Sequence, residues 1–214
     1  VILVLMFIGG IKLKHFALLI GSIVVIGGLG LIVIFNFPDI LPRSETWKNR
    51  IESFVSADKG EENFQAEQSK IAVATGVIIG KGPGNSIQRN ILPHPYSDFI
   101  YAILVEEWGL AGGILILLLY LIILYRGVTI AHNSSYLFPA YLSYGLSLML
   151  VLQALINMAV AVNLLPVTGQ TLPLMSIGGS SLIAVGISLG IILNISLNLP
   201  IEENEKNGKN ESDN

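Results

Sequence analysis

Four apolar runs constrain the fold of this chain more than any other feature. They cover residues 16–37, 99–125, 137–165 and 176–199. Each is longer than the ~18 residues that a helix needs to cross the hydrocarbon core of a bilayer. Because only helices and closed barrels satisfy their backbone polar groups in that core, we expect an all-α fold, a polytopic membrane helix bundle.

Composition supports this expectation. Only 13% of the residues are charged, whereas soluble domains carry about 25%. The chain has no cysteine, which excludes disulfides and thiolate metal sites. Nothing in the charge pattern indicates nucleic-acid binding. Part of the acidic charge lies in residues 201–214, which we expect to be a disordered cytoplasmic tail.

The beginning of the chain resembles the end of a further span. Residues 1–8 are apolar but supply only about a third of the ~20 residues of a membrane helix. The basic region of a signal peptide is missing. We therefore expect residues 1–200 to be the C-terminal part of a longer membrane domain. The fragment alone is expected to be inactive, because the missing spans would complete its cavity.

Basic residues in the short connections predict the orientation. They are Lys12, Lys14, Arg126, Lys206 and Lys209. The positive-inside rule places these connections in the cytoplasm. The segments 38–97 and 164–175 then lie outside. The basic residues of the first do not overturn this, because the rule weakens for loops of about 60 residues or more.

The long outer segment is expected to contain two helices. Ser44 can cap the first, which has one apolar face. That face carries Trp47, Ile51, Phe54 and Val55. Such a helix would lie on the outer membrane surface. Residues 61–73 are predicted to form a second, polar helix.

A cationic, glycine-rich turn, Gly80-Lys-Gly-Pro-Gly84, follows. A nucleotide-binding P-loop is rejected, because that motif needs Gly-x-x-x-x-Gly-Lys followed by Ser or Thr. Two interpretations stay open. The backbone N–H groups of the turn could approach a pyrophosphate, or the turn could be a flexible connection.

Asp98 lies one residue before an apolar run, at the outer membrane edge. Partial burial there would suit a general base. Alternatively, Ser97 or Asp98 caps the following helix.

Farther along, Glu106 and Glu107 lie roughly 12–14 Å from Asp98 along a helix axis. For them a structural hydrogen bond is favoured over a proton path.

Polar groups in the last two runs also need partners. Gln153, Asn157 and Asn163 are expected to form hydrogen bonds between helices.

Residues 166–173 contain two prolines and a glycine, so they are predicted to be irregular. Irregular backbone near a membrane must be buried in protein or line a wet cavity. Residues 178–181 (Gly-Gly-Ser-Ser) would open the last helix, with close helix packing as the alternative interpretation.

Three of these segments resemble motifs of the SEDS family of bacterial membrane proteins (FtsW, RodA and SpoVE), and the resemblance runs from about residue 43 to residue 195. Residues 93–100 read Pro-His-Pro-Tyr-Ser-Asp-Phe-Ile, where the family usually reads Pro-Glu-x-His-Thr-Asp-Phe-Ile. Residues 106–110 match its Glu-Glu-x-Gly-Leu segment. Residues 164–181 match Leu-Leu-Pro-Thr-Thr-Gly-x-x-x-Pro-x-x-Ser-x-Gly-Gly-Ser-Ser, with Val167 in place of a Thr. Asn157 matches the Asn of the family's Asn-Ile-Gly motif.

The resemblance implies an FtsW-like, inverting peptidoglycan glycosyltransferase that polymerises lipid II during cell division. Asp98 would be the catalytic general base. The candidates for substrate binding are Lys81, Asn85, Ser86, Gln88, Arg89, Arg50, Thr168, Gly178, Gly179 and Ser180. Of these, Lys81, Arg89 and Arg50 would offer charge to the leaving diphosphate.

The family also implies partners and a location. The partners are a class B penicillin-binding protein and other division proteins, and the location is the bacterial cytoplasmic membrane at the division septum. No cofactor is firmly implied, and a divalent cation stays open. Two rival functions remain: a lipid II flippase, which should carry broken helices and charges at the midplane, and a non-catalytic division scaffold.

Overall fold

The computed structural model describes residues 1–36, 61–93 and 95–199, and every regular element in these ranges is helical. The elements are α1 (Ile2–Ile8), α2 (Leu13–Asn36), α4 (Glu61–Gly76), the 3₁₀ turn η2 (Gln88–Asn90), α5 (Ile100–Asn133), α6 (Leu137–Ala161) and α7 (Gly179–Leu197). The predicted all-α class is confirmed. Arg50, the helix predicted after Ser44 and the 201–214 tail lie outside the described residues.

Four of the described helices are long and apolar enough to cross a membrane: α2, α5, α6 and α7. The prediction of a polytopic membrane helix bundle is therefore confirmed, with shifted boundaries. Helix α5 continues past the predicted end at residue 125 to Asn133, and α6 ends at Ala161 instead of residue 165. The predicted polar helix at 61–73 corresponds to α4.

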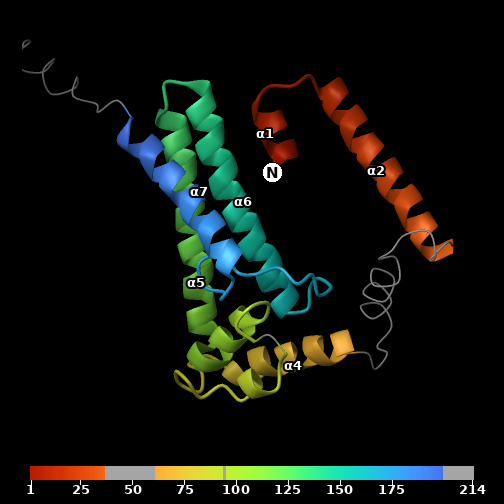
Figure 1. The fold of residues 1–214 in the computed structure, drawn as a ribbon, viewed down its shortest axis with the longest axis vertical. Helices are drawn as coiled ribbons and strands as arrows, with labels where there is room; N and C mark the ends of the chain where they lie inside the picture. The colour runs from red at the N-terminus through yellow and green to blue at the C-terminus, as the bar shows by residue number, and fades with distance from the viewer. Residues whose placement is uncertain (37–60, 94, 200–214) are drawn as a thin grey trace, which may run out of the picture.

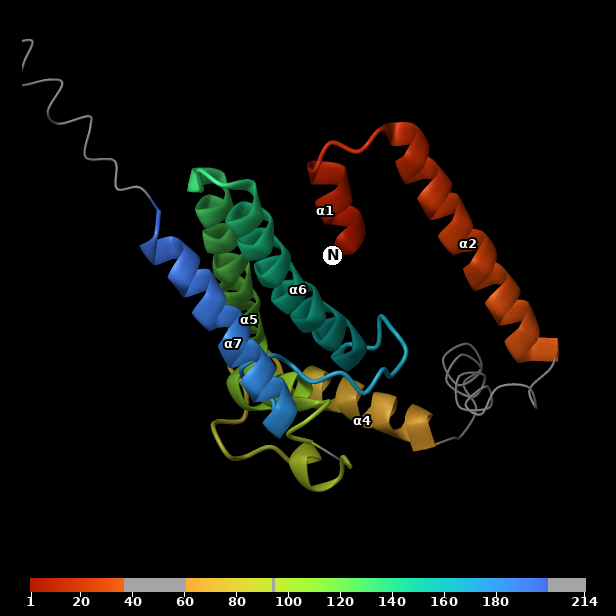
Figure 2. The same ribbon diagram turned by 45° about the horizontal axis from the view of Figure 1, so that its top comes forward.

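Helices α5, α6 and α7 run side by side, and α4 crosses one end of this group (Figures 1 and 2). The turn between α1 and α2, the turn between α5 and α6, and the end of α7 all lie at the opposite end. This arrangement agrees with the orientation predicted from the basic residues. Helix α2 stands apart in both views, and none of its Leu13–Gly30 window is buried.

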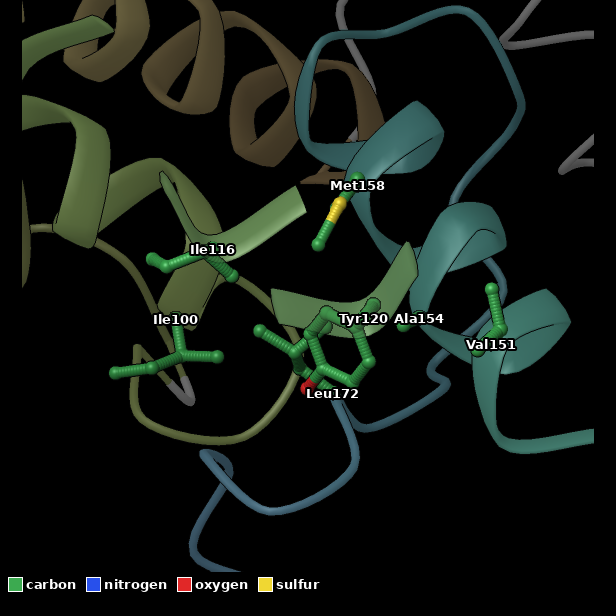
Figure 3. Packing of buried hydrophobic residues seen from close by; sticks show 7 residues of the cluster. All are labelled: Ile100, Ile116, Tyr120, Val151, Ala154, Met158 and Leu172. Atoms are coloured by element: carbon green, nitrogen blue, oxygen red, sulfur yellow. The ribbon is translucent and has the colours of Figure 1, made fainter. Parts of the chain in front are cut away.

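The hydrophobic core joins α5, α6 and the loop 162–178. Its buried members are Ile100, Ile116, Tyr120, Val151, Ala154, Met158 and Leu172 (Figure 3). Leu172 comes from the loop between α6 and α7, and the Tyr120 hydroxyl donates a hydrogen bond to the carbonyl of Pro173 in the same loop. The core therefore fixes this loop against the two longest helices.

Helix α5 is interrupted at Gly109, where φ is 71° and ψ is −173°. The interruption leaves backbone groups without helical partners, and the segment after α4 supplies replacements. The four bonds are Lys81 N–H to Glu106 C=O (3.0 Å), Gly82 N–H to Glu107 C=O (2.9 Å), Leu110 N–H to Val77 C=O (2.9 Å) and Ala111 N–H to Ile78 C=O (3.3 Å). The apolar run predicted as one helix is thus two helical segments joined at this break.

Glycine is required where the two backbones meet. A Cβ on Gly109 would lie 2.2 Å from the carbonyl oxygen of Ile78, and a Cβ on Gly80 would lie 2.2 Å from that of Glu107. Both residues also have positive φ angles, which side-chain-bearing residues rarely adopt. The break and the turn after α4 are therefore a single structural feature.

Candidate functional site

Asp98 lies immediately before α5 and is half-buried. Phe99 is the N-cap residue of α5, and no side-chain capping bond is present there. The interpretation of Ser97 or Asp98 as a helix cap is therefore wrong. Instead the Ser97 hydroxyl donates a 2.8 Å hydrogen bond to Oδ1 of Asp98, and among the described residues no donor binds Oδ2.

The loop 162–178 lies against the segment that carries Asp98. The Ser176 hydroxyl donates to the carbonyl of Ser97 (2.6 Å), and the Ile177 N–H donates to the carbonyl of Tyr96 (2.9 Å). A Cβ on Gly169 would lie 3.8 Å from Oδ2 of Asp98, so this glycine directly faces the carboxylate. Two motifs that are far apart in sequence meet at one carboxylate.

Two amide side chains of α6 support this meeting point. Asn157 Nδ2 donates to the carbonyls of Asp98 (2.9 Å) and Gln170 (2.6 Å). Gln153 Nε2 donates to the carbonyl of Thr171 (3.1 Å). We expected these side chains to bond to other helices, and this expectation is wrong. Both side chains donate to backbone carbonyls outside the helices. Asn163 lies beyond the end of α6, with a φ of 58°.

The loop itself is irregular, as predicted, and is held by its own side chains. The Leu172 N–H donates to the Ser176 hydroxyl (2.7 Å), and the hydroxyls of Thr171 and Ser181 lie 3.1 Å apart. Leu172 and Pro173 are fully buried, so this irregular backbone is packed in protein, as the membrane argument requires.

The small residues after the loop begin α7, as expected. Gly178 is its N-cap residue and is half-buried. Gly179 and Ser180 follow in the first turn and are exposed, as is Thr168 in the loop. These four residues of the predicted binding set are thus near or at the protein surface, at the end of the bundle that α4 crosses.

Glu106 forms a second polar centre, on the α4 side of α5. Its side chain is fully buried and accepts hydrogen bonds from five donors. They are Lys81 Nζ (2.5 Å), Ser86 Oγ (2.5 Å), the backbone N–H groups of Gln88 (3.2 Å) and Ile87 (3.3 Å), and Thr75 Oγ1 (3.5 Å). The favoured interpretation of Glu106 is a structural hydrogen bond to a neighbouring helix. Its contacts are structural, but only Thr75 belongs to an α-helix, α4, and the other donors lie in the segment after it.

The predicted substrate-binding residues of the glycine-rich loop fall into two sets. Lys81, Ser86 and Gln88 are drawn towards Glu106 by the bonds described above, and Lys81 retains only 28% side-chain exposure. Asn85 is exposed and donates to the carbonyl of Lys81 (3.1 Å). Arg89 is half-buried, and its guanidinium has no ion-pair partner in the described part of the chain.

The backbone of the turn is already hydrogen-bonded. The N–H groups of Gly80, Lys81 and Gly82 donate to the carbonyls of Gly76, Glu106 and Glu107. These three groups are therefore not available to a pyrophosphate, and the turn is not a loose connection either. The sequence left open a turn whose backbone approaches a pyrophosphate and a flexible connection. The structure corrects both, because these three N–H groups are bonded within the protein.

Several contacts of the site were not anticipated from sequence. Ser97 and Ser176 join the two motifs, and the pairing of Lys81 with Glu106 links residues that are distant in the chain. The serines were visible inside the two motifs, but nothing in the sequence indicated which groups they bind. Among the residues that the structure describes, no group of three His, Cys, Asp or Glu side chains could hold a metal ion.

Comparisons with known proteins agree with the family resemblance. The family profile FTSW_RODA_SPOVE, described as "Cell cycle protein", matches residues 1–200. Stage V sporulation protein E of Bacillus subtilis is 40% identical over 195 residues, which are 91% of this chain and 51% of that protein. The probable peptidoglycan glycosyltransferase FtsW of Marinobacter nauticus is 39% identical over 201 residues, with 90% and 47% covered.

A solved structure is also similar to this chain and agrees with the family match. It is described as "Structural coordination of polymerization and crosslinking by a peptidoglycan synthase complex", and it matches with a TM-score of 0.65 at 28% identity. The match covers 92% of this chain and 53% of that one. The chain thus spans about half the length of the proteins it resembles. Since the family profile matches almost all of its residues, the chain belongs to the FtsW, RodA and SpoVE family of cell cycle proteins.

Proposed function

We propose that the protein containing this chain is a peptidoglycan glycosyltransferase that polymerises lipid II at the outer face of the cytoplasmic membrane. The observation that carries this proposal is the meeting of Asp98 with the loop 162–178. A half-buried carboxylate lies at the end of the bundle predicted to be external, and one of its oxygens faces Gly169. Relatives named as probable peptidoglycan glycosyltransferases support the reaction class.

Asp98 has the position and the contacts of a general base. In the proposed reaction, the 4-hydroxyl of the acceptor GlcNAc attacks the anomeric carbon of the donor MurNAc. A C–O bond forms there, the bond to undecaprenyl pyrophosphate breaks with inversion from α to β, and Asp98 receives the hydroxyl proton. Within the described residues its carboxylate accepts one hydrogen bond, from the neutral Ser97 hydroxyl, so no cation in these ranges competes for it.

Cationic groups would stabilise the departing diphosphate. Arg89 is the better candidate in the glycine-rich loop, because Lys81 is paired with the Glu106 carboxylate. Arg50 remains a candidate by sequence alone. Asn85, Thr168, Gly179 and Ser180 are exposed and could contact the sugar or the pyrophosphate. A divalent cation would act on the same diphosphate charge.

We further propose a class B penicillin-binding protein as partner, with other division proteins around it and a location at the division septum. The peptidoglycan synthase complex to which the chain is similar supports a partner that crosslinks the new strand. The sequence motifs favour an FtsW-like role in division.

The flippase alternative requires charges near the membrane midplane. In the described membrane helices, Glu106 and Glu107 precede the break at Gly109, near the outer end of α5, and Glu106 is neutralised by Lys81. Helices α6 and α7 contain no Asp, Glu, Lys or Arg. These observations favour chemistry at the outer surface over transport through the bundle.

The test is strand synthesis by the full-length parent protein with its penicillin-binding protein, whose crosslinking activity is blocked. Wild type is compared with Asp98→Asn, which keeps the shape of the side chain and removes the base. Glu67→Gln is the matched control, because Glu67 is an exposed carboxylate on α4. Folding of each variant is checked by thermal unfolding.

We expect glycan strands from wild type and from Glu67→Gln, and none from folded Asp98→Asn. Equal synthesis by Asp98→Asn would remove Asp98 from the chemistry. If no variant polymerises lipid II but wild type moves it across vesicle membranes, the flippase is the correct function. Neither activity, together with retained binding of division proteins, would indicate a scaffold.

A further inference from the structure

Three consecutive large apolar side chains are exposed at the turn after α4. Val77, Ile78 and Ile79 are 69%, 66% and 86% exposed. They belong to the segment 38–97, which the sequence predicted to lie outside the cytoplasm, and no residue from 71 to 80 carries a charge. Contiguous exposed apolar surface of this kind marks an interaction site.

The exposure follows from a fixed backbone. The carbonyls of Val77 and Ile78 accept hydrogen bonds from Leu110 and Ala111 at the break in α5. Val77 also has a φ of 50°, a left-handed conformation that is uncommon for a β-branched residue. The hydrogen bonds hold the turn in this position, so its side chains cannot turn inward.

The turn continues the apolar surface of α5. Around the break, α5 exposes a series of large apolar side chains: Trp108 just before it, and Leu110, Ile114, Leu115 and Leu118 after it. Leu110 belongs to the same hydrogen-bonded junction as Val77, so the two surfaces are adjacent. Trp108, 54% exposed, is the first member of this exposed series, and Trp is enriched at the membrane interface.

We propose that the Val77–Ile79 turn inserts into the acyl chains of the outer leaflet, beside α5. The occupant of this surface is lipid, because the surface is uncharged and adjoins an exposed face of a membrane-spanning helix. Backbone at this depth must be satisfied internally, and the bonds from α5 provide this for the carbonyl groups of Val77 and Ile78. The proposal does not depend on the glycosyltransferase activity.

Insertion would set the height of the neighbouring loop. Lys81 follows the apolar turn directly, and Pro83, Gly84 and Asn85 come next. A polar loop beside an inserted turn would lie at the level of the lipid head groups, with the Lys81 ammonium itself paired with Glu106. The glycine-rich loop would then stand at the membrane surface, where a lipid-linked substrate carries its own phosphates.

The experiment measures the surroundings of Ile79 in the full-length parent protein. A nitroxide is attached to Ile79→Cys in phosphatidylglycerol and phosphatidylethanolamine vesicles, and its collision rates with oxygen and with a water-soluble nickel complex are compared. This chain has no cysteine of its own. Labels at Leu118, exposed on α5, and at Lys70, exposed on α4, are the lipid and water controls.

We expect the Ile79 label to collide with oxygen as often as the Leu118 label does, and at least fivefold less with nickel than the Lys70 label does. Nickel collisions equal to those at Lys70 would place the turn in water and overturn the proposal. Low collision rates with both reagents would mean that protein covers the turn, from the rest of the parent chain or from a partner, and would overturn it equally.

Discussion

Replacing Glu106 by Gln tests whether one carboxylate holds the glycine-rich loop. Oε1 accepts from Lys81, Ile87 and Thr75, and Oε2 accepts from Ser86 and Gln88. A glutamine keeps one oxygen and turns an NH₂ group towards the remaining donors. In either orientation at least two hydrogen bonds are lost and the positive charge of Lys81 is unpaired.

The size of the effect follows from these contacts. Hydrogen bonds to a charged group contribute about 1.5–3 kcal/mol each, so the loss of two at the low end gives about 3 kcal/mol. This is also the lower end of the ~3–5 kcal/mol measured when one partner of a buried ion pair is removed. The lower end applies because Lys81 is partly exposed and can be rehydrated.

Hydrogen exchange of the full-length parent protein measures this directly. The amides of Lys81 and Gly82 are suitable reporters, because they donate to the backbone carbonyls of Glu106 and Glu107, which the substitution leaves in place. A loss of about 3 kcal/mol should accelerate their exchange by roughly 100-fold. Exchange within α6 should stay unchanged.

Glu107→Gln is the matched control for this experiment. Its side chain is half-buried, and no hydrogen bond to it occurs in the described ranges, so the same change of charge to amide should leave exchange at Lys81 and Gly82 as it was. Unchanged exchange in Glu106→Gln, or equal acceleration in both variants, would refute the reasoning that the Glu106 carboxylate fixes the loop.

Two further substitutions test the packing around the site, each by thermal unfolding of the purified parent protein. Gly109→Ala should lower stability by about 1–3 kcal/mol from backbone strain alone, and its Cβ would also clash with Ile78. The control is Gly186→Ala, which has open space around it and should be neutral or gain up to ~1 kcal/mol of helix propensity. Equal unfolding temperatures of the two variants would contradict the strained break. Asn157→Ala should lower the free energy of unfolding by about 1–3 kcal/mol, because the carbonyls of Asp98 and Gln170 lose their donor. It should also reduce strand synthesis, because Asp98 is held less firmly. An unchanged unfolding temperature would show that these bonds contribute nothing to stability.

The membrane helices could be predicted because each is encoded locally. An apolar run needs no knowledge of its neighbours, so the spans differ from prediction only at their ends and at the break in α5. Helix α5 extends past Arg126 because a helix can leave the apolar layer without ending. The break at Gly109 could not be predicted, since it depends on carbonyls and amides that the turn at Val77 supplies from elsewhere in the chain.

The candidate site was predictable in its residues and not in its contacts. Asp98 was identified from its place at the membrane edge and from the family motif. A polar side chain such as Asn157 has to bond to something, but sequence gives no distance, and loop carbonyls were the partners. The pairing of Lys81 with the buried Glu106 escaped prediction for the same reason, because only folding brings the two residues together.

The contact between Gly80 and Gly109 has a consequence for how this protein can change during evolution. Their backbones touch, so the chain between them is a closed lobe whose two ends meet at one point. The entropy of closing such a lobe rises only slowly with its length. Residues can therefore be added to or removed from the lobe's outer parts at a small entropic cost, while the contact between Gly80 and Gly109 keeps α4 and α5 together.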